Sequence, residues 1–162
     1  MLNFNSPIRD LLPGLRELSA QENPTQSKVT RTFETMMIEP AIYLPALMRD
    51  HAKAGGSIVE QEFTSPLELA KLKEQVIVNC TGFGSAALFH DDELLPIKGQ
   101  LTILKPQAEV DYVALVENLY MFPRKDGIVL GGTFERGVAT LEPNQAAEQR
   151  ILSSHAKFFN SL

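Results

Sequence analysis

Apolar residues change their spacing along the chain, and this spacing predicts which segments form helices and which form strands. In the first part, apolar positions at helical intervals alternate with short strand-like runs. The run at 76–80 is apolar throughout, which is typical of a strand buried on both faces. We therefore expect short helices over 7–12, 43–54 and 66–73, and strands over 30–40, 57–63 and 76–80.

After residue 90 the pattern becomes that of an antiparallel sheet followed by a helix. Strand-like runs lie at 98–106, 111–123 and 127–134. The hairpin dipeptide Asp126-Gly127 stands between the last two, so the runs are expected to form a meander. A helix is expected over 142–159, with its apolar positions at Ala147, Ile151, Leu152, Phe158 and Phe159. The whole pattern predicts an α+β fold, α/β in the broad sense, with helices flanking an antiparallel sheet.

Composition and charge narrow the classes of partner. The chain has 162 residues and a net charge of -5, which argues against a nucleic acid or an anionic membrane as partner. No apolar run approaches the roughly 20 residues needed to span a bilayer, and no secretory signal is visible at the start. Cys80 is the only cysteine, so no intrachain disulfide can form. The histidines lie far apart, so no metal site is expected.

One glycine-rich segment raises the question of a nucleotide. Gly82 to Ala87 fits G-x-G-x-x-A and follows the expected strand at 76–80. A dinucleotide fingerprint also needs a full helix after it and an acidic residue about twenty positions on. The segment before the next strand is too short for a crossover helix, and Thr102 stands where the acid would be. Two readings stay open: a tight turn after a buried strand, and a secondary cofactor contact.

The other candidate residues are individually weak. Tyr120 stands on a predicted strand near a double glycine, where it could line a pocket or be a half-buried hairpin tyrosine. Lys98 could touch a cofactor, although a solvated strand-end lysine is commoner. Ser85 has no histidine partner in the pattern, so nucleophilic catalysis is not indicated. Pattern alone predicts an α/β domain with a small-ligand turn, and assigns no catalytic residue.

Several motifs in order resemble a known family. The segments "VNCTG" (78–82), "PIKGQ" (96–100), "YMFPR" (120–124) and "LGGTFERG" (130–137) are similar to those of the FAD-dependent D-amino-acid oxidases. The likeness extends over about residues 11 to 155. Each motif is short, but their order and spacing together are specific.

The resemblance implies a fold, a cofactor and three site residues. Members have a substrate domain with a large antiparallel sheet and an FAD-binding domain, and they oxidise a small D-amino acid. Thr81 and Phe63 match cofactor-binding positions, and Tyr120 matches a tyrosine that hydrogen-bonds the substrate carboxylate. Residues 1–42 and 95–142 would belong to the substrate-binding domain, and 43–94 and 143–162 to the FAD-binding domain. A cytoplasmic or peroxisomal location is implied.

Departures from the family pattern are equally informative. The family's first-strand G-x-G-x-x-G, its carboxylate-clamping arginine and its glycine-rich C-terminal segment have no counterpart here, and a second pocket tyrosine is replaced by Val116. We therefore expect the central part of such an enzyme, which alone neither holds FAD tightly nor turns over. The alternative is a non-catalytic module that binds a small carboxylate or pairs with a partner, as a homo-oligomer or through exposed strand edges.

Overall fold

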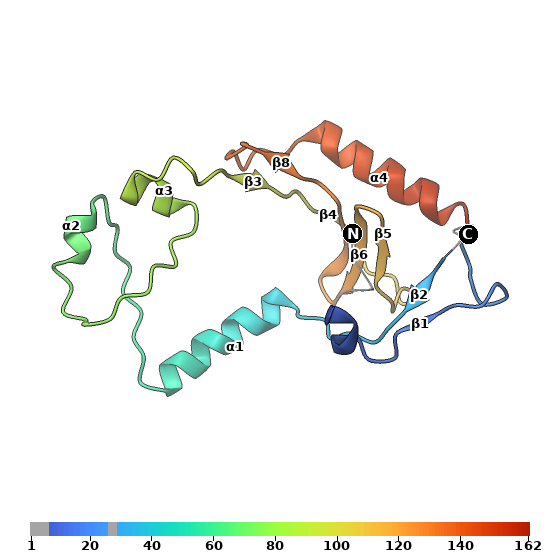
Figure 1. Ribbon diagram of the computed structural model, residues 1–162, viewed down its shortest axis with the longest axis horizontal. Coiled ribbons are helices and arrows are strands. Elements are labelled where there is room, and N and C mark those ends of the chain that lie inside the picture. Colours follow the sequence, from blue (N-terminus) through green and yellow to red (C-terminus); the bar gives the residue numbers. More distant parts are fainter. Residues whose placement is uncertain (1–6, 26–28) are drawn as a thin grey trace. The chain divides into compact units, whose positions relative to one another are not determined.

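The computed structural model describes residues 7–25 and 29–162, which form two compact units. The first, called here the sheet unit, consists of the N-terminal segment up to Pro45, Gln100–Thr133 and Pro143–Leu162. The second, called the loop unit, consists of Ala46–Gly99 and Phe134–Glu142. Figure 1 labels the elements of both. The division shows that the chain passes from one unit to the other more than once.

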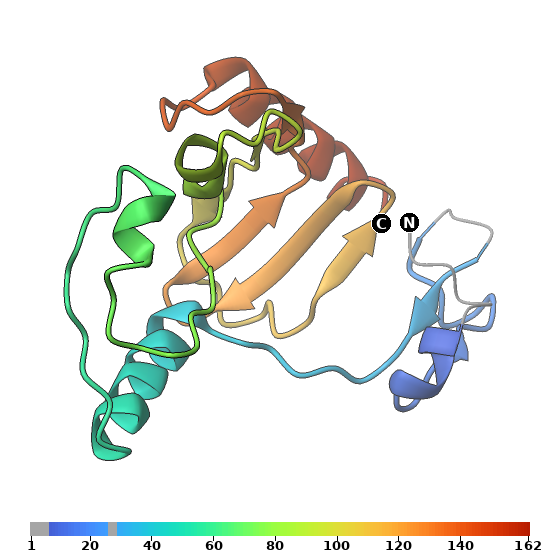
Figure 2. The same ribbon diagram turned by 60° about the vertical axis from the view of Figure 1, so that its left-hand side comes forward.

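The sheet unit is built around a four-stranded antiparallel sheet in the order β4-β7-β6-β5. Figure 2 shows its strands side by side. The expected meander of the runs at 98–106, 111–123 and 127–134 is only partly confirmed: β5 pairs with β6 and β6 with β7, but β4 pairs with β7 and not with the strand that follows it in the chain. The strands are β4 (Thr102–Leu104), β5 (Ala114–Val116), β6 (Leu119–Arg124) and β7 (Gly127–Gly131).

Turn chemistry accounts for both hairpins. Arg124 pairs with Gly127, and the Arg124 guanidinium bonds the Asp126 carboxylate across the turn, from Nε to Oδ1 at 2.8 Å and from Nη2 to Oδ2 at 2.6 Å. The expected single strand over 111–123 is wrong: the chain turns back between β5 and β6, with Glu117 in the left-handed region at φ 53°. No glycine marks this turn, so the sequence pattern conceals it.

Helix α4 (Gln145–Phe159) packs on one face of this sheet and closes the core. Asn144 caps its first turn, since the Asn144 side-chain oxygen accepts the Ala147 N–H at 3.1 Å. Ile151 is only 1% exposed. The buried core cluster contains Met121, Ile128, Leu130 and Ile151.

Hydrogen bonds of Gln100 link the start of α4 to the segment before β4. Its side-chain amide accepts the Asn144 N–H at 2.7 Å and donates to the Asn144 carbonyl at 3.1 Å. Its backbone N–H and carbonyl both bond the Thr133 hydroxyl. The expected strand over 98–106 is accordingly interrupted here: Ile97–Lys98 forms β3 and Thr102–Leu104 forms β4, in two different sheets.

The N-terminal part of the sheet unit has little regular structure. The expected short helix is confirmed as the 3-10 helix η1 (Pro7–Leu11). Strand β1 (Arg16–Glu17) pairs with β2 (Arg31–Thr32). The expected strand over 30–40 is therefore largely wrong, since only its start is paired. A strand needs a hydrogen-bonding neighbour along its length, and β1 offers one for only two residues.

The loop unit contains short helices and one small sheet. Helix α1 (Pro40–Lys53) leads into it from the sheet unit, and begins earlier than expected. Helix α2 (Pro66–Leu69) is shorter than expected, but its capping box is confirmed by bonds in both directions between Ser65 and Glu68. Helix α3 (Gly84–Phe89) has six residues. Strands β3 and β8 (Glu135–Arg136) pair antiparallel.

Two strands expected in the loop unit do not form. Segments 57–63 and 76–80 have no ladder partner, and Val76 and Val78 are 81% and 77% exposed. The expectation of a strand buried on both faces at 76–80 is therefore wrong for this chain. An apolar run becomes a strand only where neighbouring strands accept its backbone bonds, and the described residues provide none. No helix in the described part of the chain is both long and apolar enough to cross a membrane.

Candidate functional site

Tyr120 lies on the face of the sheet opposite α4. Successive strand residues alternate between faces, and Met121, its neighbour on β6, belongs to the core beneath α4. Tyr120 pairs with Gly131 on β7 and with Leu115 on β5. Side chains at the rim of this face are half exposed: Leu115 is 47% and Ile103 is 53% exposed. We call this face, with Ile103, Leu115, Tyr120, Phe122, Val129 and Gly131, the open face.

Gly131 makes room for the Tyr120 ring. A Cβ at Gly131 would overlap the ring and hydroxyl atoms of Tyr120. The ring also packs beside Phe122, with centroids 5.3 Å apart and planes inclined by 52°. The Tyr120 hydroxyl has no hydrogen-bond partner among the described residues, so it is free to bond a polar group of a ligand.

The guanidinium of Arg124 on the same face of β6 is already bonded to a carboxylate. Arg124 stands four residues after Tyr120 and therefore shares its face. Both bonds of its guanidinium fork go to Asp126 within the turn, and the Arg124 side chain is 18% exposed. On the open face, the hydroxyl of Tyr120 is thus available to the carboxylate of a ligand. The guanidinium of Arg124 is already paired with the carboxylate of Asp126.

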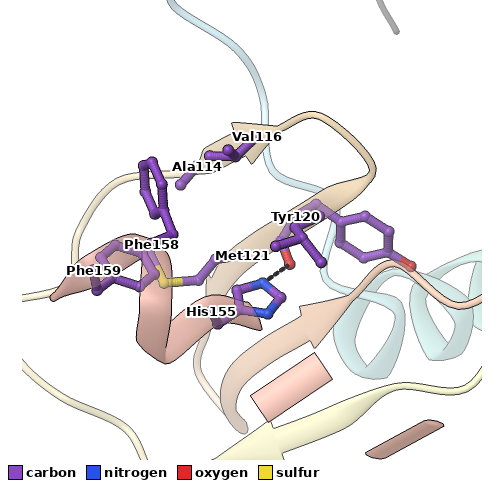
Figure 3. A pocket seen from close by; sticks show the side chains of 8 residues that line it. Ala114, Val116, Tyr120, Met121, His155, Phe158 and Phe159 are labelled. Carbon is purple, nitrogen blue, oxygen red and sulfur yellow. Dashed lines mark hydrogen bonds between the residues drawn. The ribbon is translucent and has the colours of Figure 1, made fainter. Parts of the chain in front are cut away.

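The hollow nearest to Tyr120 lies on the other side of the strand. Its free volume is about 10 Å³, which is room for about one water molecule. Phe158 and Phe159 are among the residues that line this hollow, and Figure 3 shows that the Tyr120 ring points away from them. The hollow belongs to the packing of α4 on the sheet and is too small for an amino acid.

Thr81 belongs to a small hydroxyl and amide cluster in the loop unit. The Thr81 hydroxyl donates to the Asn79 side-chain oxygen at 2.8 Å and lies 2.7 Å from the Ser85 hydroxyl. The Asn79 amide in turn donates to Ser85 at 2.9 Å. All these bonds are exposed. The cluster holds the turn that leads into α3, and it orients the Thr81 hydroxyl.

The glycine turn beside Thr81 leaves backbone donors available. Gly82 has φ 57°, and nothing lies within 4 Å of the place where its Cβ would be. The N–H groups of Gly82 and Phe83 have no partner in the part of the chain that the structure describes. The six residues of α3 confirm that no full helix follows the turn, so Gly82 to Ala87 lacks the helix of a dinucleotide fingerprint.

Phe63, the third expected site residue, is half-buried and lies in an irregular segment just before α2. No hydrogen bond or ring contact joins Phe63 to Thr81 in the described residues. Phe63 and Thr81 lie in the loop unit, and Tyr120 lies in the sheet unit. Within residues 7–25 and 29–162, no group of three or more His, Cys, Asp or Glu side chains could hold a metal ion.

Sequence reasoning missed two residues that act on Tyr120. Gly131 is needed for the close approach of the ring, and buried His155 contacts the Tyr120 carbonyl. A signal for His155 was present, because Ala147, Ile151 and His155 stand four residues apart on one face of α4. A histidine on that apolar stripe indicates a buried imidazole with a polar partner.

Comparisons with known proteins define the class of the chain. Residues 5–162 match the family described as FAD dependent oxidoreductase, and the chain belongs to this family. Among its relatives, a D-amino-acid oxidase of Rubrobacter xylanophilus is 33% identical over 149 residues, which are 89% of this chain and 45% of the relative. A D-amino-acid oxidase of Streptomyces coelicolor is 30% identical over 146 residues, 87% of this chain and 44% of that relative.

A third relative carries a different substrate name. The human D-aspartate oxidase is 27% identical over 147 residues, 89% of this chain and 43% of the relative. The chain thus spans less than half the length of these curated relatives. The suspected resemblance to the FAD-dependent D-amino-acid oxidase family is confirmed.

The family's cofactor is FAD, and the described residues fit one contact with it. The turn at 79–85 offers the Thr81 hydroxyl, two backbone N–H groups and open space above Gly82. It does not enclose a ligand, because Thr81, Gly82 and Phe83 are all exposed. The turn is therefore suited to touch the cofactor from one side.

Proposed function

We propose that this chain forms the substrate-facing sheet and one cofactor contact of an FAD-dependent D-amino-acid oxidase. Such an enzyme converts a D-amino acid, dioxygen and water to a 2-oxo acid, ammonia and peroxide. Bound FAD would supply the redox chemistry, as acceptor of the hydride from the substrate's α-carbon and as reductant of dioxygen. The D-amino-acid oxidases among the relatives support this reaction. In this proposal, the residues of the chain itself bind and orient the substrate and contact the cofactor.

The observation that carries the proposal is the Tyr120 hydroxyl on the open face. A phenol without a partner can donate one hydrogen bond to a carboxylate, and such charge-assisted bonds are about twice as strong as neutral ones. The rings of Tyr120 and Phe122 give the α-carbon and side chain of a small amino acid an apolar floor. Gly131 fixes where that hydroxyl stands.

Thr81 and Phe63 are proposed as the cofactor-binding residues of the loop unit. The Thr81 hydroxyl is oriented by Asn79 and Ser85. In the same proposal, residues 1–42 and 95–142 belong to the substrate-binding domain, and 43–94 and 143–162 to the FAD-binding domain. Helix α4 packs on the sheet that carries Tyr120.

A chimera tests the function directly. The region of the Rubrobacter oxidase that matches this chain is replaced by this chain, and peroxide is assayed with paired D- and L-amino acids. We expect flavin-dependent oxidation of D-amino acids only. A chimera that folds and holds FAD but oxidises no D-amino acid would contradict the proposal.

Substitution of Tyr120 in the same chimera tests its role. Tyr120→Phe keeps the ring and removes the hydroxyl, and loss of one charge-assisted bond of about 1.5–3 kcal/mol should raise KM roughly ten- to a hundredfold. Tyr112→Phe is the matched control, because Tyr112 lies outside the strands and is 48% exposed. Equal KM values for the two variants would remove Tyr120 from the substrate site.

A second candidate is a module that pairs with another chain. The exposed apolar run at 76–80, with Val76 and Val78, favours this alternative, because unpaired extended segments readily accept a partner strand. Light scattering at increasing concentration tests it. A mass that rises with concentration in the parent chain, and falls to the monomer in Val78→Lys, supports pairing. A monomer throughout contradicts it.

A further inference from the structure

His155 is a buried polar side chain to which the proposed function gives no task. It lies on α4, is 5% exposed, and is surrounded by the apolar contacts between helix and sheet. Its Nε2 lies 3.2 Å from the carbonyl oxygen of Tyr120, and its Nδ1 lies 2.9 Å from the carbonyl oxygen of Ile151, one turn back on the helix. Figure 3 shows the bond to Tyr120.

Both partners of the imidazole are carbonyl oxygens, so each contact is a hydrogen bond only when its ring nitrogen carries a hydrogen. A carbonyl oxygen only accepts hydrogen bonds, so the contact with Tyr120 requires a hydrogen on Nε2 of His155. The tautomer that carries its hydrogen on Nε2 donates to the main chain of Tyr120.

The bond connects the two faces of the sheet through one residue. The carbonyl of Tyr120 is held from the α4 side, while its ring packs on the open face against Gly131 and Phe122. The peptide unit that His155 fastens is directly attached to the Cα that carries the ring. A shift of this peptide would rotate the Cα–Cβ bond and displace the hydroxyl at the far end of the ring.

We propose that His155 is a positioning residue for Tyr120, which sets the place of the Tyr120 hydroxyl on the open face through the Nε2–carbonyl bond. The inference rests on the proposed function only in the use of Tyr120 for a substrate carboxylate. His155 itself touches neither substrate nor cofactor.

Two conservative substitutions distinguish the bond from simple packing. Gln places its amide nitrogen near the position of Nε2, whereas Asn reaches only about as far as Nδ1. In the full chain with ring-labelled tyrosine, we expect His155→Gln to leave the ring signals of Tyr120 near their parent positions. We expect His155→Asn to move them toward those of the exposed Tyr43 and Tyr112. Long-range nitrogen spectra of the parent should show a slowly exchanging hydrogen on Nε2.

Leu152→Ala is the matched control for lost packing. Leu152 packs against the same core from the same helix, but the bond to Tyr120 does not involve it. It should lower stability while the Tyr120 signals keep their positions. If His155→Asn leaves those signals unchanged, or if it moves them no more than Leu152→Ala does, the positioning role is overturned.

A titration with D-alanine separates this proposal from the proposed function. Where D-alanine shifts the Tyr120 signals of the parent chain, His155→Asn should weaken binding about five- to tenfold, the equivalent of one hydrogen bond, and His155→Gln should restore it. If D-alanine moves the Tyr120 signals in no variant while His155→Asn still displaces the ring, positioning stands, and the substrate role of Tyr120 is decided by Tyr120→Phe in the chimera.

Discussion

The sheet unit and the loop unit use similar apolar sequences with opposite results. In the sheet unit, Ile128, Val129 and Leu130 are each 3% exposed. In the loop unit, Val76 and Val78 are 81% and 77% exposed. Hydrophobicity therefore does not separate these segments. Each strand of the sheet finds its partner within the described residues of the same unit, whereas the run at 76–80 does not.

The comparison teaches that the number of nearby partners decides which apolar run becomes a strand. Burying apolar area stabilises by about 25 cal/mol per Å², but an extended backbone also has to place its N–H and C=O groups. A hairpin such as β6–β7 satisfies both needs through a turn of two residues.

The largest expected effect comes from removing a core side chain of the sheet unit. Ile151→Ala should lower the free energy of unfolding by about 2–5 kcal/mol, because it leaves a cavity between α4 and the sheet. Ile58→Ala, at a loop-unit residue that is 63% exposed, should change it by less than about 0.5 kcal/mol. Urea titration of both variants measures the difference. Similar losses would mean that the two units share a common core.

Helices, turns and the hairpin at 124–127 could be predicted where the signal is local, whereas the pairing of β4 with β7 could not. The capping box at Ser65, the hairpin at Asp126-Gly127 and the apolar stripe of α4 each contain their own information. The strands at 57–63 and 76–80 could not be judged locally, since their fate depends on segments outside the window. The turn at Glu117 was missed because its positive φ falls on a residue that usually avoids it.

A second test concerns the close contact on the open face. Gly131→Ala introduces a Cβ where the Tyr120 ring lies, so the ring must swing away and the free energy of unfolding should fall by about 1–3 kcal/mol. Gly99→Ala is the control from the loop unit, because nothing lies within 4 Å of its Cβ position. Denaturation gives the cost, and the Tyr120 ring signals give the displacement. An unmoved ring in Gly131→Ala would contradict this packing.

The sequence predicted only some residues of the candidate site, because local motifs do not contain long-range contacts. Thr81 and Tyr120 came from motifs that resemble a family, and the structure adds their surroundings, the Asn79–Ser85 cluster and the Gly131 contact. His155 lies 35 positions from Tyr120 in sequence. A contact of that separation depends on how α4 packs, which no local pattern contains.

A third test compares helix caps in the two units. Asn144→Ala removes the acceptor for the Ala147 N–H, and because α4 covers the core it should lower the free energy of global unfolding by about 1 kcal/mol. Ser65→Ala removes the equivalent bond of α2, but the loss should stay local, since no residue of α2 is buried. Urea titration reports the first effect and amide hydrogen exchange the second. Global destabilisation by Ser65→Ala would show that α2 unfolds together with the core.

The smallest expected effect is electrostatic and is found in one exposed carboxylate of each unit. In the sheet unit, the pKa of Glu22 is lowered from 4.5 to about 2, first by the hydrogen bond from Arg16 and then by those from Ser19. In the loop unit, the pKa of Glu68 is also lowered, first by the backbone N–H of Thr64. Both pKa values are depressed, so both contributions are present above 4.5. They are lost as the pH falls through the folded-state values.

The two units differ in the group that lowers the pKa of the carboxylate, which is a side chain for Glu22 and a backbone N–H for Glu68. Arg16→Gln removes the main donor to Glu22, so the midpoint of Glu22 in a carboxyl-carbon NMR titration should rise toward 4.5, while that of Glu68 stays where it was. Thr64→Val removes only the side-chain bond to Glu68 and leaves the 2.7 Å backbone bond, so the pKa of Glu68 should stay low. A parent Glu22 that titrates near 4.5 would contradict the Arg16 bond. A Glu68 that loses its shift in Thr64→Val would mean that the side chain, and not the turn of the backbone, holds this carboxylate.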